Sequence, residues 1–552
     1  MNLPKEIYFP LNMGRNKKDN SKTRVTAPFN YSISLRDWLI ENGFAGDLEL
    51  EGLTYVYVQA EGTPQQNAVE LQEAYDLAKS RVATYGEQIV IVAPGNFDFA
   101  SDFLADGDQV SIAGLLNRVP AIVFTGVGTI NVTGQFCGFM GIDTDGKPFI
   151  VGDNVGAGFL NCEGGDESFG FGVNSVGYFE KCSAGNNSFG ADGAASGQYV
   201  DCQAGDESFG WNGNADGYFL RCNAGEYSFG AYGEASGNFI DCNANDGSFA
   251  GFGDATGDFK DCQAGSASFG AYGTADGYFQ DCRAEESSFG AYGNASGYFI
   301  NSKAGFGSFG SVGTASGYFV NCLSMASSFG SGPGSTATGE FINCVGDNNS
   351  FGGSNATASG TFTNCMAGSG SFGNGISSGT FKDCKGGDNS FGSLSSGNFK
   401  NCIGGNNSFG GIASGRFENC IAGDESFGFE DDATGIFINC TAGDYSFGST
   451  AGAAADGVFT NCNSGDFSFG YQSLASGIFT NCTAERDSFG AEGTASGIFT
   501  NCTAGVDSFG GGGTLTAAAR LYYCKLAFGT FDTSVAIIRL SIDGTNTEIN
   551  AN

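Results

Sequence analysis

Apolar and polar positions in the middle of the chain recur in one short pattern. Eighteen times between residues 159 and 509, an aromatic residue is followed three positions later by cysteine, once by serine. Seven positions further on stands a Phe, nearly always within Ser-Phe-Gly. These two distances never change, whereas the stretch before the next aromatic residue varies. Each repeat therefore has a fixed arc and a loop, which is typical of a solenoid whose coils bury their apolar faces against one another.

The length of the repeat predicts strands rather than helices. Successive cysteine positions lie 18 to 22 residues apart, which is too short for a pair of helices. The 93 Gly, 52 Phe and only 8 Pro favour short strands joined by tight turns. We therefore expect an all-β fold, a single-stranded parallel β-helix of 18 regular coils. A four-sided solenoid of the pentapeptide type is the alternative, because 20 is four times five, although coils of 18, 19, 21 and 22 residues disfavour it.

Like residues lie on like residues in such a stack, so the fixed arc predicts the core. We expect two columns of aromatic rings and one column of cysteines. Representative members of this core ladder are Phe179, Cys182, Phe189, Phe299, Phe309, Phe499, Cys502 and Phe509.

The residue before the cysteine predicts a bend in the fixed arc. An aromatic residue and a cysteine three positions apart on a flat strand would face opposite sides. In sixteen of the eighteen repeats the residue before the cysteine is Asn or Asp, and both types tolerate the left-handed conformation that lets both neighbours face inward. The predicted turn residues include Asn161, Asp201, Asn321 and Asn501. The two exceptions, Lys181 and Arg221, are expected to be strained or differently turned.

The cysteines are expected to be free, buried thiols. All of the nineteen except Cys137 and Cys524 form a ladder with one member per coil. Neighbouring side chains that point the same way cannot easily reach the torsion of a disulfide. The chain has no histidine and no CxxC pair, so we expect neither a metal site nor a cofactor.

Four segments follow from these patterns. Residues 1–60 are non-repetitive and are expected to serve in attachment or oligomerisation. Residues 61–150 contain a helix and the first irregular coils, residues 151–514 the regular repeats, and residues 515–552 a C-terminal cap that covers the exposed strand edges of the last coil. The helix shows an apolar stripe at helical spacing, with Asn67 as the expected N-cap and Gly86 as the stop.

The segment after this helix carries a family resemblance. The turn Pro94-Gly95 with Phe97, followed by the strand pattern of Asp108, Val110, Ile112 and Gly114, resembles the entry of pectate-lyase-like right-handed β-helices. Phage tailspikes and tail fibres often use that fold, with the helix covering the open end of the first coil. The stretch ARLYYCKLAFGTF (519–531) is similar to the end segment of many phage tail proteins. The right-handed sense is what this resemblance implies.

The resemblance implies a function in host attachment. We expect a structural or adhesive virion protein without catalysis, a tail fibre or tailspike-like homotrimer. Its N-terminal region would bind a virion or baseplate protein, and its loops a host surface glycan. The alternatives are a tailspike that depolymerises polysaccharide, and a bacterial cell-surface filament or adhesin.

Charge and hydropathy exclude other partners. The net charge of −35 opposes binding to nucleic acid or to anionic membranes. The chain has no Sec-type leader and no run of eighteen apolar residues, so no membrane insertion is expected. Synthesis in the cytoplasm without a Sec signal, followed by assembly into a virion or display on a cell surface, is the expected localisation.

The acidic residues recur at one place in the coil, as in Asp166 with Glu167, Asp206 with Glu207, and Asp424 with Glu425. An active site needs a unique environment, so this recurrence favours a solvated face over a catalytic pair or a calcium site. We therefore expect no catalytic residues. Since coil lengths differ by at most four residues, we also expect a surface with little relief.

Overall fold

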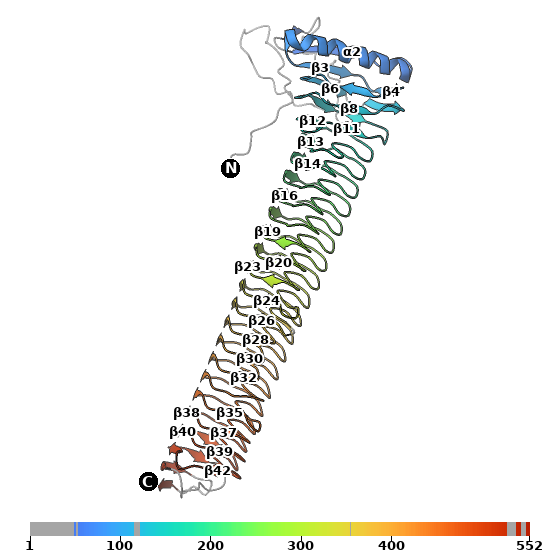
Figure 1. Cartoon of the computed structure of the whole chain (residues 1–552). Helices are drawn as coiled ribbons and strands as arrows, with labels where there is room; N and C mark the ends of the chain where they lie inside the picture. The colour runs from blue at the N-terminus through green and yellow to red at the C-terminus, as the bar shows by residue number, and fades with distance from the viewer. Residues whose placement is uncertain are drawn as a thin grey trace, which may run out of the picture. The chain divides into compact units, whose positions relative to one another are not determined.

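The computed structural model describes residues 49–50, 53–114, 122–353, 355–526, 537–542 and 548–551. Most of the expected attachment segment, residues 1–60, lies outside the described residues. The chain forms a parallel β-solenoid of right-handed type with about 22 turns and an N-terminal helix (Figure 1). This confirms the predicted β-helix. The chain divides into two compact units, Met1–Ala264 and Gly265–Asn552, which are described separately.

The first unit opens with the helix α2 (Pro64–Tyr85), which packs on β2 (Leu53–Val58), β3 (Gln88–Val92) and β4 (Gly95–Phe99). Its buried stripe includes Leu71 and Tyr75. The Tyr75 hydroxyl accepts a 2.8 Å hydrogen bond from the backbone N–H of Gly107. The helix therefore covers apolar side chains of the first described coils.

The predicted N-cap of this helix is wrong. Thr63 is the N-cap, and it forms a capping box with Gln66, while Pro64 occupies the first turn. Asn67 is instead buried inside the first turn of the helix, where its amide donates to the carbonyl of Asn96 at 3.1 Å. The predicted stop is confirmed, because Gly86 is the C-cap with φ of 77°.

The coils that precede the regular repeats use longer strands. Strand β2 pairs in parallel with β3, and β3 with β6. The remaining strands of this segment are β1 (Glu49–Leu50), β5 (Phe103–Ala105), β6 (Val110–Gly114), β7 (Ile122–Gly126), β8 (Ile130–Val132), β9 (Gly138–Met140), β10 (Ile142–Asp143) and β11 (Phe149–Val151).

Each regular coil has a three-residue strand around the first aromatic residue, and these strands pair in register from coil to coil. In the first unit they are β12 (Gly158–Leu160), β13 (Tyr178–Glu180), β14 (Gln198–Val200), β15 (Tyr218–Leu220), β16 (Asn238–Ile240) and β17 (Asp258–Lys260). In the second unit they are β19 (Tyr278–Gln280), β21 (Tyr298–Ile300), β23 (Tyr318–Val320), β25 (Glu340–Ile342), β27 (Thr361–Thr363), β29 (Thr380–Lys382), β31 (Asn398–Lys400), β33 (Arg416–Glu418), β34 (Ile436–Ile438), β36 (Val458–Thr460), β38 (Ile478–Thr480) and β40 (Ile498–Thr500).

Two-residue strands in the second unit form two further parallel sheets on another side of the coil. The eight-stranded sheet contains β18 (Thr274–Ala275), β20 (Asn294–Ala295), β22 (Thr314–Ala315), β24 (Thr336–Ala337), β26 (Thr357–Ala358), β28 (Ile376–Ser377), β30 (Leu394–Ser395) and β32 (Ile412–Ala413). The four-stranded sheet contains β35 (Ala454–Ala455), β37 (Leu474–Ala475), β39 (Thr494–Ala495) and β42 (Thr514–Leu515).

The core of each coil is built by residues of the fixed arc, such as residues 299–310. All eight representatives of the predicted core ladder are buried. Phe219 stacks on Phe239 with ring centroids 4.8 Å apart and planes 1° apart. The second column, that of the Ser-Phe-Gly residues, meets the first edge to face. Within a coil, Ala295, Gly297 and Phe299 are buried at two-residue steps, so the four-sided pentapeptide alternative is not the fold observed.

The residue before each cysteine adopts the predicted left-handed conformation. The φ angles are 50° at Asn161, 55° at Asp201, 53° at Asn321 and 52° at Asn501. The two exceptions to Asn and Asp follow the same path, with φ of 54° at Lys181 and 53° at Arg221. They are therefore not differently turned, and each holds a side chain in a conformation that costs free energy.

The Phe of Ser-Phe-Gly is also left-handed, which the sequence pattern did not predict. Phe309 has φ of 53° and the following Gly310 has φ of 65°. A Cβ at Gly310 would lie 2.6 Å from the carbonyl oxygen of Thr314. Two successive left-handed residues turn the chain sharply at the end of the fixed arc, and glycine is favoured at the second of them, although Ala250 takes the same position with φ of 56°.

Side-chain ladders join successive coils. The amide of Asn321 donates to the side-chain oxygen of Asn301 at 3.0 Å, and Asn343 donates to Asn321 at 3.1 Å. The thiol of Cys322 lies 3.3 Å from the carbonyl oxygen of Phe299 in the preceding coil. A buried serine ladder runs beside the second Phe column, in which the N–H of Ser288 donates to the hydroxyl of Ser308 at 3.2 Å. The coils are therefore held together by polar bonds as well as by ring stacking.

The expectation that Cys524 lies outside the cysteine ladder is wrong. Its thiol lies 3.3 Å from the carbonyl oxygen of Phe499, as the ladder requires, and Leu521 takes the place of the aromatic residue. The last strands of the second unit are β41 (Thr503–Ala504), β43 (Arg520–Tyr522), β44 (Lys525–Leu526), β45 (Ile537–Ile542) and β46 (Glu548–Ala551). Strand β45 pairs in parallel with β43 and antiparallel with β46.

Candidate functional site

The recurring acidic residues have a structural task in the described coils. The carboxylate of Asp424 accepts a hydrogen bond from the backbone N–H of Asp444 at 2.9 Å, and that of Asp444 accepts from Asp466 at 2.8 Å. The amide oxygen of Asn406 makes the same bond to Asp424 at 3.0 Å. The side chain at this position therefore satisfies a backbone donor of the next coil. The row is more than a solvated face, and its repetition follows from the repetition of the coil.

A groove arises where the coils are shortest. From the Phe of Ser-Phe-Gly to the Phe of the next three-residue strand, the chain advances ten positions at Phe427 to Phe437. It advances only eight positions at Phe391 to Phe399 and at Phe409 to Phe417. The shortening falls in the variable arc, the stretch between Ser-Phe-Gly and the next strand. The coil that follows is longer, and its residues 429–432 stand between the eight-stranded and the four-stranded sheet.

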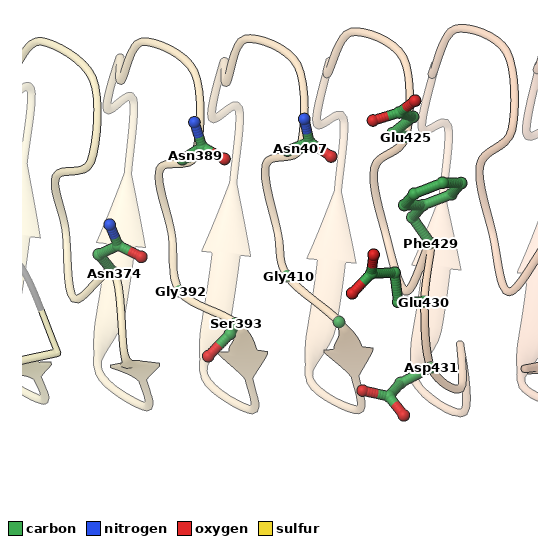
Figure 2. Close-up of a pocket in the computed structure, with 11 residues that line it drawn as sticks. Asn374, Asn389, Gly392, Ser393, Asn407, Gly410, Glu425, Phe429, Glu430 and Asp431 are labelled. Atoms are coloured by element: carbon green, nitrogen blue, oxygen red, sulfur yellow. The ribbon is translucent and has the colours of Figure 1, made fainter.

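These differences create a groove with a volume of about 390 Å³ in the second unit (Figure 2). Asn389, Asn407 and Glu425 form one side, each from the left-handed position two residues before the Phe of its coil. The other side comes from the variable arcs. The lining residues are Asn374, Asn389, Gly392, Ser393, Asn407, Gly410, Gly411, Glu425, Phe429, Glu430 and Asp431. The expectation of a surface with little relief is therefore wrong at these coils.

Glycines keep the groove open. Gly410 has φ of 55°, and a Cβ there would lie 2.0 Å from the carbonyl oxygen of Gly392. No side chain fits at that point, so the backbone forms this part of the groove wall. The groove lies partly on the fixed arc, which we had expected to be occupied only with the core. The local signal in the sequence is the loss of two residues per coil, but its effect depends on the longer neighbouring coil.

The groove offers hydrogen-bonding groups and one ring. The amides of Asn389 and Asn407 and the carboxylates of Glu425 and Glu430 can each bind hydroxyl groups, and the half-buried ring of Phe429 can pack against an apolar face. Pyranose sugars present both kinds of surface. The lining contains no cysteine and no basic residue, so this groove is suited to binding a neutral, hydroxyl-rich ligand.

The cysteines of the described coils are buried away from solvent and from possible substrates. All nineteen cysteines are buried and carry thiols rather than disulfides. Burial raises the pKa of the Cys182 and Cys222 thiols, and it raises the pKa of the Cys137 thiol to about 12. In the described residues, no group of three or more acidic or cysteine side chains is arranged to hold a metal ion.

Exposed aromatic residues form short stacks outside the groove. Tyr272 and Tyr292 stack with ring centroids 4.7 Å apart, and about half of each side chain remains exposed. Trp211 meets Tyr232 edge to face at 5.8 Å in the first unit. Tyr272 and Tyr292 occupy the same position in neighbouring coils, as a repeated structural position does. Within the described segments, no helix is both long and apolar enough to cross a bilayer.

Comparison of the chain with family models, with curated proteins and with solved structures finds no match.

Proposed function

We propose that this protein is a structural and adhesive virion component, a phage tail fibre or tailspike-like protein that attaches to the host surface without catalysis. The observation that carries the proposal is that one part of each coil forms the core, while changes in coil length form a groove on the surface. The fixed arc seals two aromatic columns and a cysteine column, and the departures from regular coil length open a groove on the outside. A repetitive support with one distinct recognition surface suits attachment.

The place in a virion rests on the resemblance of about residues 64–150 to the entry of pectate-lyase-like β-helices, a fold that phage tailspikes often use. The predicted helix and the two strands that carry this resemblance exist as α2, β4 and β6. The proposal assigns the N-terminal region to a virion or baseplate protein and expects a homotrimer. The host ligand proposed for the groove is a surface glycan, because amide, hydroxyl and carboxylate groups around a ring match the chemistry of sugars.

Two measurements test the proposal. Mass spectrometry and immunogold electron microscopy of purified particles should find the chain in the tail or surface fibres of a virion. Discovery of the chain in bacterial surface filaments from cells free of phage would favour the adhesin alternative instead. The purified protein should also bind intact host cells and compete with particle adsorption.

Variants of the groove locate the binding. Phe429→Ala combined with Asn407→Ala should weaken binding to host cells, since the change removes the ring and one amide of the groove. Tyr298→Ala is the matched control, because Tyr298 is 58 % exposed on the sheet face of the same unit and does not line the groove. Equal loss in both variants, or in neither, would contradict the groove as the site of recognition.

A polysaccharide depolymerase is the second candidate. Three carboxylates, those of Glu425, Glu430 and Asp431, line the same groove, and paired carboxylates are the chemistry of glycoside hydrolysis. Incubation with host capsule or lipopolysaccharide, followed by an assay for new reducing or unsaturated ends, separates the two functions. We expect no release. Release that disappears in Glu425→Gln would replace the attachment function by catalysis.

A further inference from the structure

The coils that form the groove also carry a group of four basic residues within 35 positions of the chain. The chain has a net charge of −35, yet residues 348–418 contain four basic residues against three acidic ones. The four are Lys382, Lys385, Lys400 and Arg416, and no other Lys or Arg occurs between Lys303 and Arg486. All four side chains are exposed. We call these four residues the basic patch.

The register of the strands brings the basic patch together on one face. Lys382 of β29 and Lys400 of β31 are direct neighbours in the parallel sheet, and both point outward from strands whose Phe points inward. Lys385 follows around the left-handed turn, in the ladder that joins Met366, Lys385 and Ile403. Arg416 lies on β33, next to β31. Because strands in a sheet lie about 4.8 Å apart, the patch spans about 10 Å along the stack.

Folding alone gives no reason for this arrangement. Like charges on neighbouring strands destabilise a sheet, and most of the equivalent outward positions in other coils carry neutral residues such as Thr363, Ile438 and Thr460. Glu418 compensates part of the charge, with its carboxylate 2.9 Å from Lys400 and 3.7 Å from Arg416. Among the described residues, Lys382 and Lys385 have no carboxylate within ion-pair distance.

The acidic residues beside the patch are occupied by the coil. Asp383 accepts a hydrogen bond from the amide of Asn401 at 2.8 Å, and Asp388 accepts one from the backbone N–H of Asn406 at 2.8 Å. The outward strand positions on either side, Thr361 and Ile436, are uncharged. Charges farther than about 8 to 10 Å are screened at physiological ionic strength. An anionic group at the patch therefore experiences the local cations more strongly than the charge of the whole chain.

We propose that the basic patch binds an anionic polysaccharide whose chain runs along the stack, which specifies the ligand class of the attachment function and rests on that function. Lysines one strand apart match a polymer that carries anionic groups on successive sugars. Asn398 offers an exposed amide beside the cations for sugar hydroxyls. Duplex nucleic acid places one charge per about 1.7 Å and needs many more cations than four, so a glycan is the better fit.

The decisive experiment uses the full chain and two triple variants of equal charge change. Lys382→Thr, Lys385→Thr and Lys400→Thr remove three cations of the patch and introduce the residue found at equivalent positions in other coils. The control carries Arg283→Thr, Lys303→Thr and Lys525→Thr, which remove three cations from the ladder position of Lys385 in other coils. Circular dichroism and thermal unfolding of both variants check that the solenoid is retained.

Binding is measured with immobilised polygalacturonate, dextran sulfate, neutral dextran and single-stranded DNA. We expect the wild type and the control to bind polygalacturonate or dextran sulfate in a salt-dependent manner. The patch variant should bind about tenfold more weakly, since each exposed ion pair contributes a small factor. Neutral dextran should not distinguish the variants. Equal loss in both triple variants, no binding of either acidic polysaccharide by the wild type, or tighter patch-dependent binding of DNA would overturn the proposal.

The two proposals fail separately. If host cells bind the patch variant as well as they bind the wild type, and no acidic polysaccharide binds, the attachment function stands and the basic patch has no part in it. If the patch binds acidic polysaccharide but the chain is absent from virions, the ligand class stands and the virion assignment falls.

Discussion

The ring of Phe299 stacks on the ring of Phe319 in the next coil, with centroids 4.8 Å apart and planes 4° apart. The same ring meets Phe309 of its own coil edge to face, at 5.5 Å and 88°. Each Phe therefore contacts rings along the stack and across the coil. This geometry combines burial of a large apolar side chain with the two favoured arrangements of aromatic pairs.

Replacement of one stacked ring should be costly even in a long solenoid. Phe299→Ala leaves a cavity between Phe279, Phe319 and Phe309, and we expect it to lower the free energy of unfolding by about 3 to 5 kcal/mol. Denaturant unfolding followed by circular dichroism measures the change. Tyr298→Ala, which truncates the exposed neighbour, is the control, and a similar loss in both variants would contradict a core role for the ring.

Lys181 offers a stabilising substitution. It occupies a left-handed position with φ of 54° that Asn or Asp holds in most coils. Lys181→Asn should raise the free energy of unfolding by about 0.5 to 1 kcal/mol, because Asn tolerates this conformation better and the surface ion pair with Glu180 is worth little. The matched control is Lys260→Asn on β17, which lies in a strand and should bring no gain. An unchanged or lowered unfolding midpoint in Lys181→Asn would refute the strain assigned to this turn.

The cysteines should be inaccessible in the native chain and reduced in the unfolded one. Their burial keeps the thiols away from solvent, and it raises the pKa of thiols such as those of Cys182 and Cys222. Alkylation in denaturant without reductant, read by mass spectrometry, should label nearly all nineteen thiols. Alkylation of the folded protein should label few of them. If many cysteines resisted alkylation in denaturant, the chain would contain disulfides, and the prediction of a ladder of thiols would be wrong.

Serine should replace cysteine in this ladder at small cost. Ser302 already occupies a ladder position, and its hydroxyl lies 3.3 Å from the carbonyl oxygen of Phe279, as the thiols do in other coils. Cys322→Ser should therefore change the free energy of unfolding by about 1 kcal/mol or less. Cys322→Leu adds volume to a filled core and serves as the contrasting variant. A larger loss for Ser than for Leu would contradict the hydrogen-bonded role of the ladder.

The acidic row should depend on the acceptor and not on the charge. Asp444→Asn keeps an oxygen that accepts from the N–H of Asp466, so it should leave the free energy of unfolding nearly unchanged. Asn406 makes the same bond in the native row. Asp444→Ala removes the acceptor and should cost about 1 kcal/mol. Thermal unfolding with and without added calcium measures both effects. Stabilisation by calcium that is lost in Asp444→Asn would show a metal role instead.

One ion pair in the first unit should respond to pH. Arg221 donates to both carboxylate oxygens of Asp201, at 2.6 and 2.9 Å, and these bonds hold the pKa of Asp201 below its ordinary value. A carboxyl group with a lowered native pKa contributes stability above its unfolded pKa of about 3.9. That contribution is lost as the pH falls through the native value. The unfolding midpoint of Arg221→Asn should therefore fall less than that of the wild type on acidification.

The fixed arc could be predicted because every coil repeats it. The constant distances from Phe179 to Cys182 and from Cys182 to Phe189 set which side chains meet, and the Asn or Asp before the cysteine revealed the bend. The left-handed Phe309 could not be foreseen, because Phe rarely takes this conformation by itself. It is held there by the bond from its N–H to the carbonyl of Ser288 and by the freedom of Gly310.

Errors arose where one residue replaced a member of the pattern. The last coil was not recognised because Leu521 stands where the other coils have an aromatic residue. Asn67 was taken as the N-cap, although Thr63, Pro64 and Gln66 have the order of a capping box. The groove was missed for a different reason. A shortened loop forms a groove only where a neighbouring coil is longer, so the groove cannot be recognised from the sequence of a single repeat.

The asparagine and cysteine ladders share a direction. The amide of Asn343 donates to Asn321, and the thiol of Cys344 points to the carbonyl of Phe319, in each case toward the coil made earlier. A coil that emerges from the ribosome therefore finds these acceptors already in position. The solenoid can grow coil by coil during synthesis, in the order in which the chain is translated, with each completed coil serving as the template for the next.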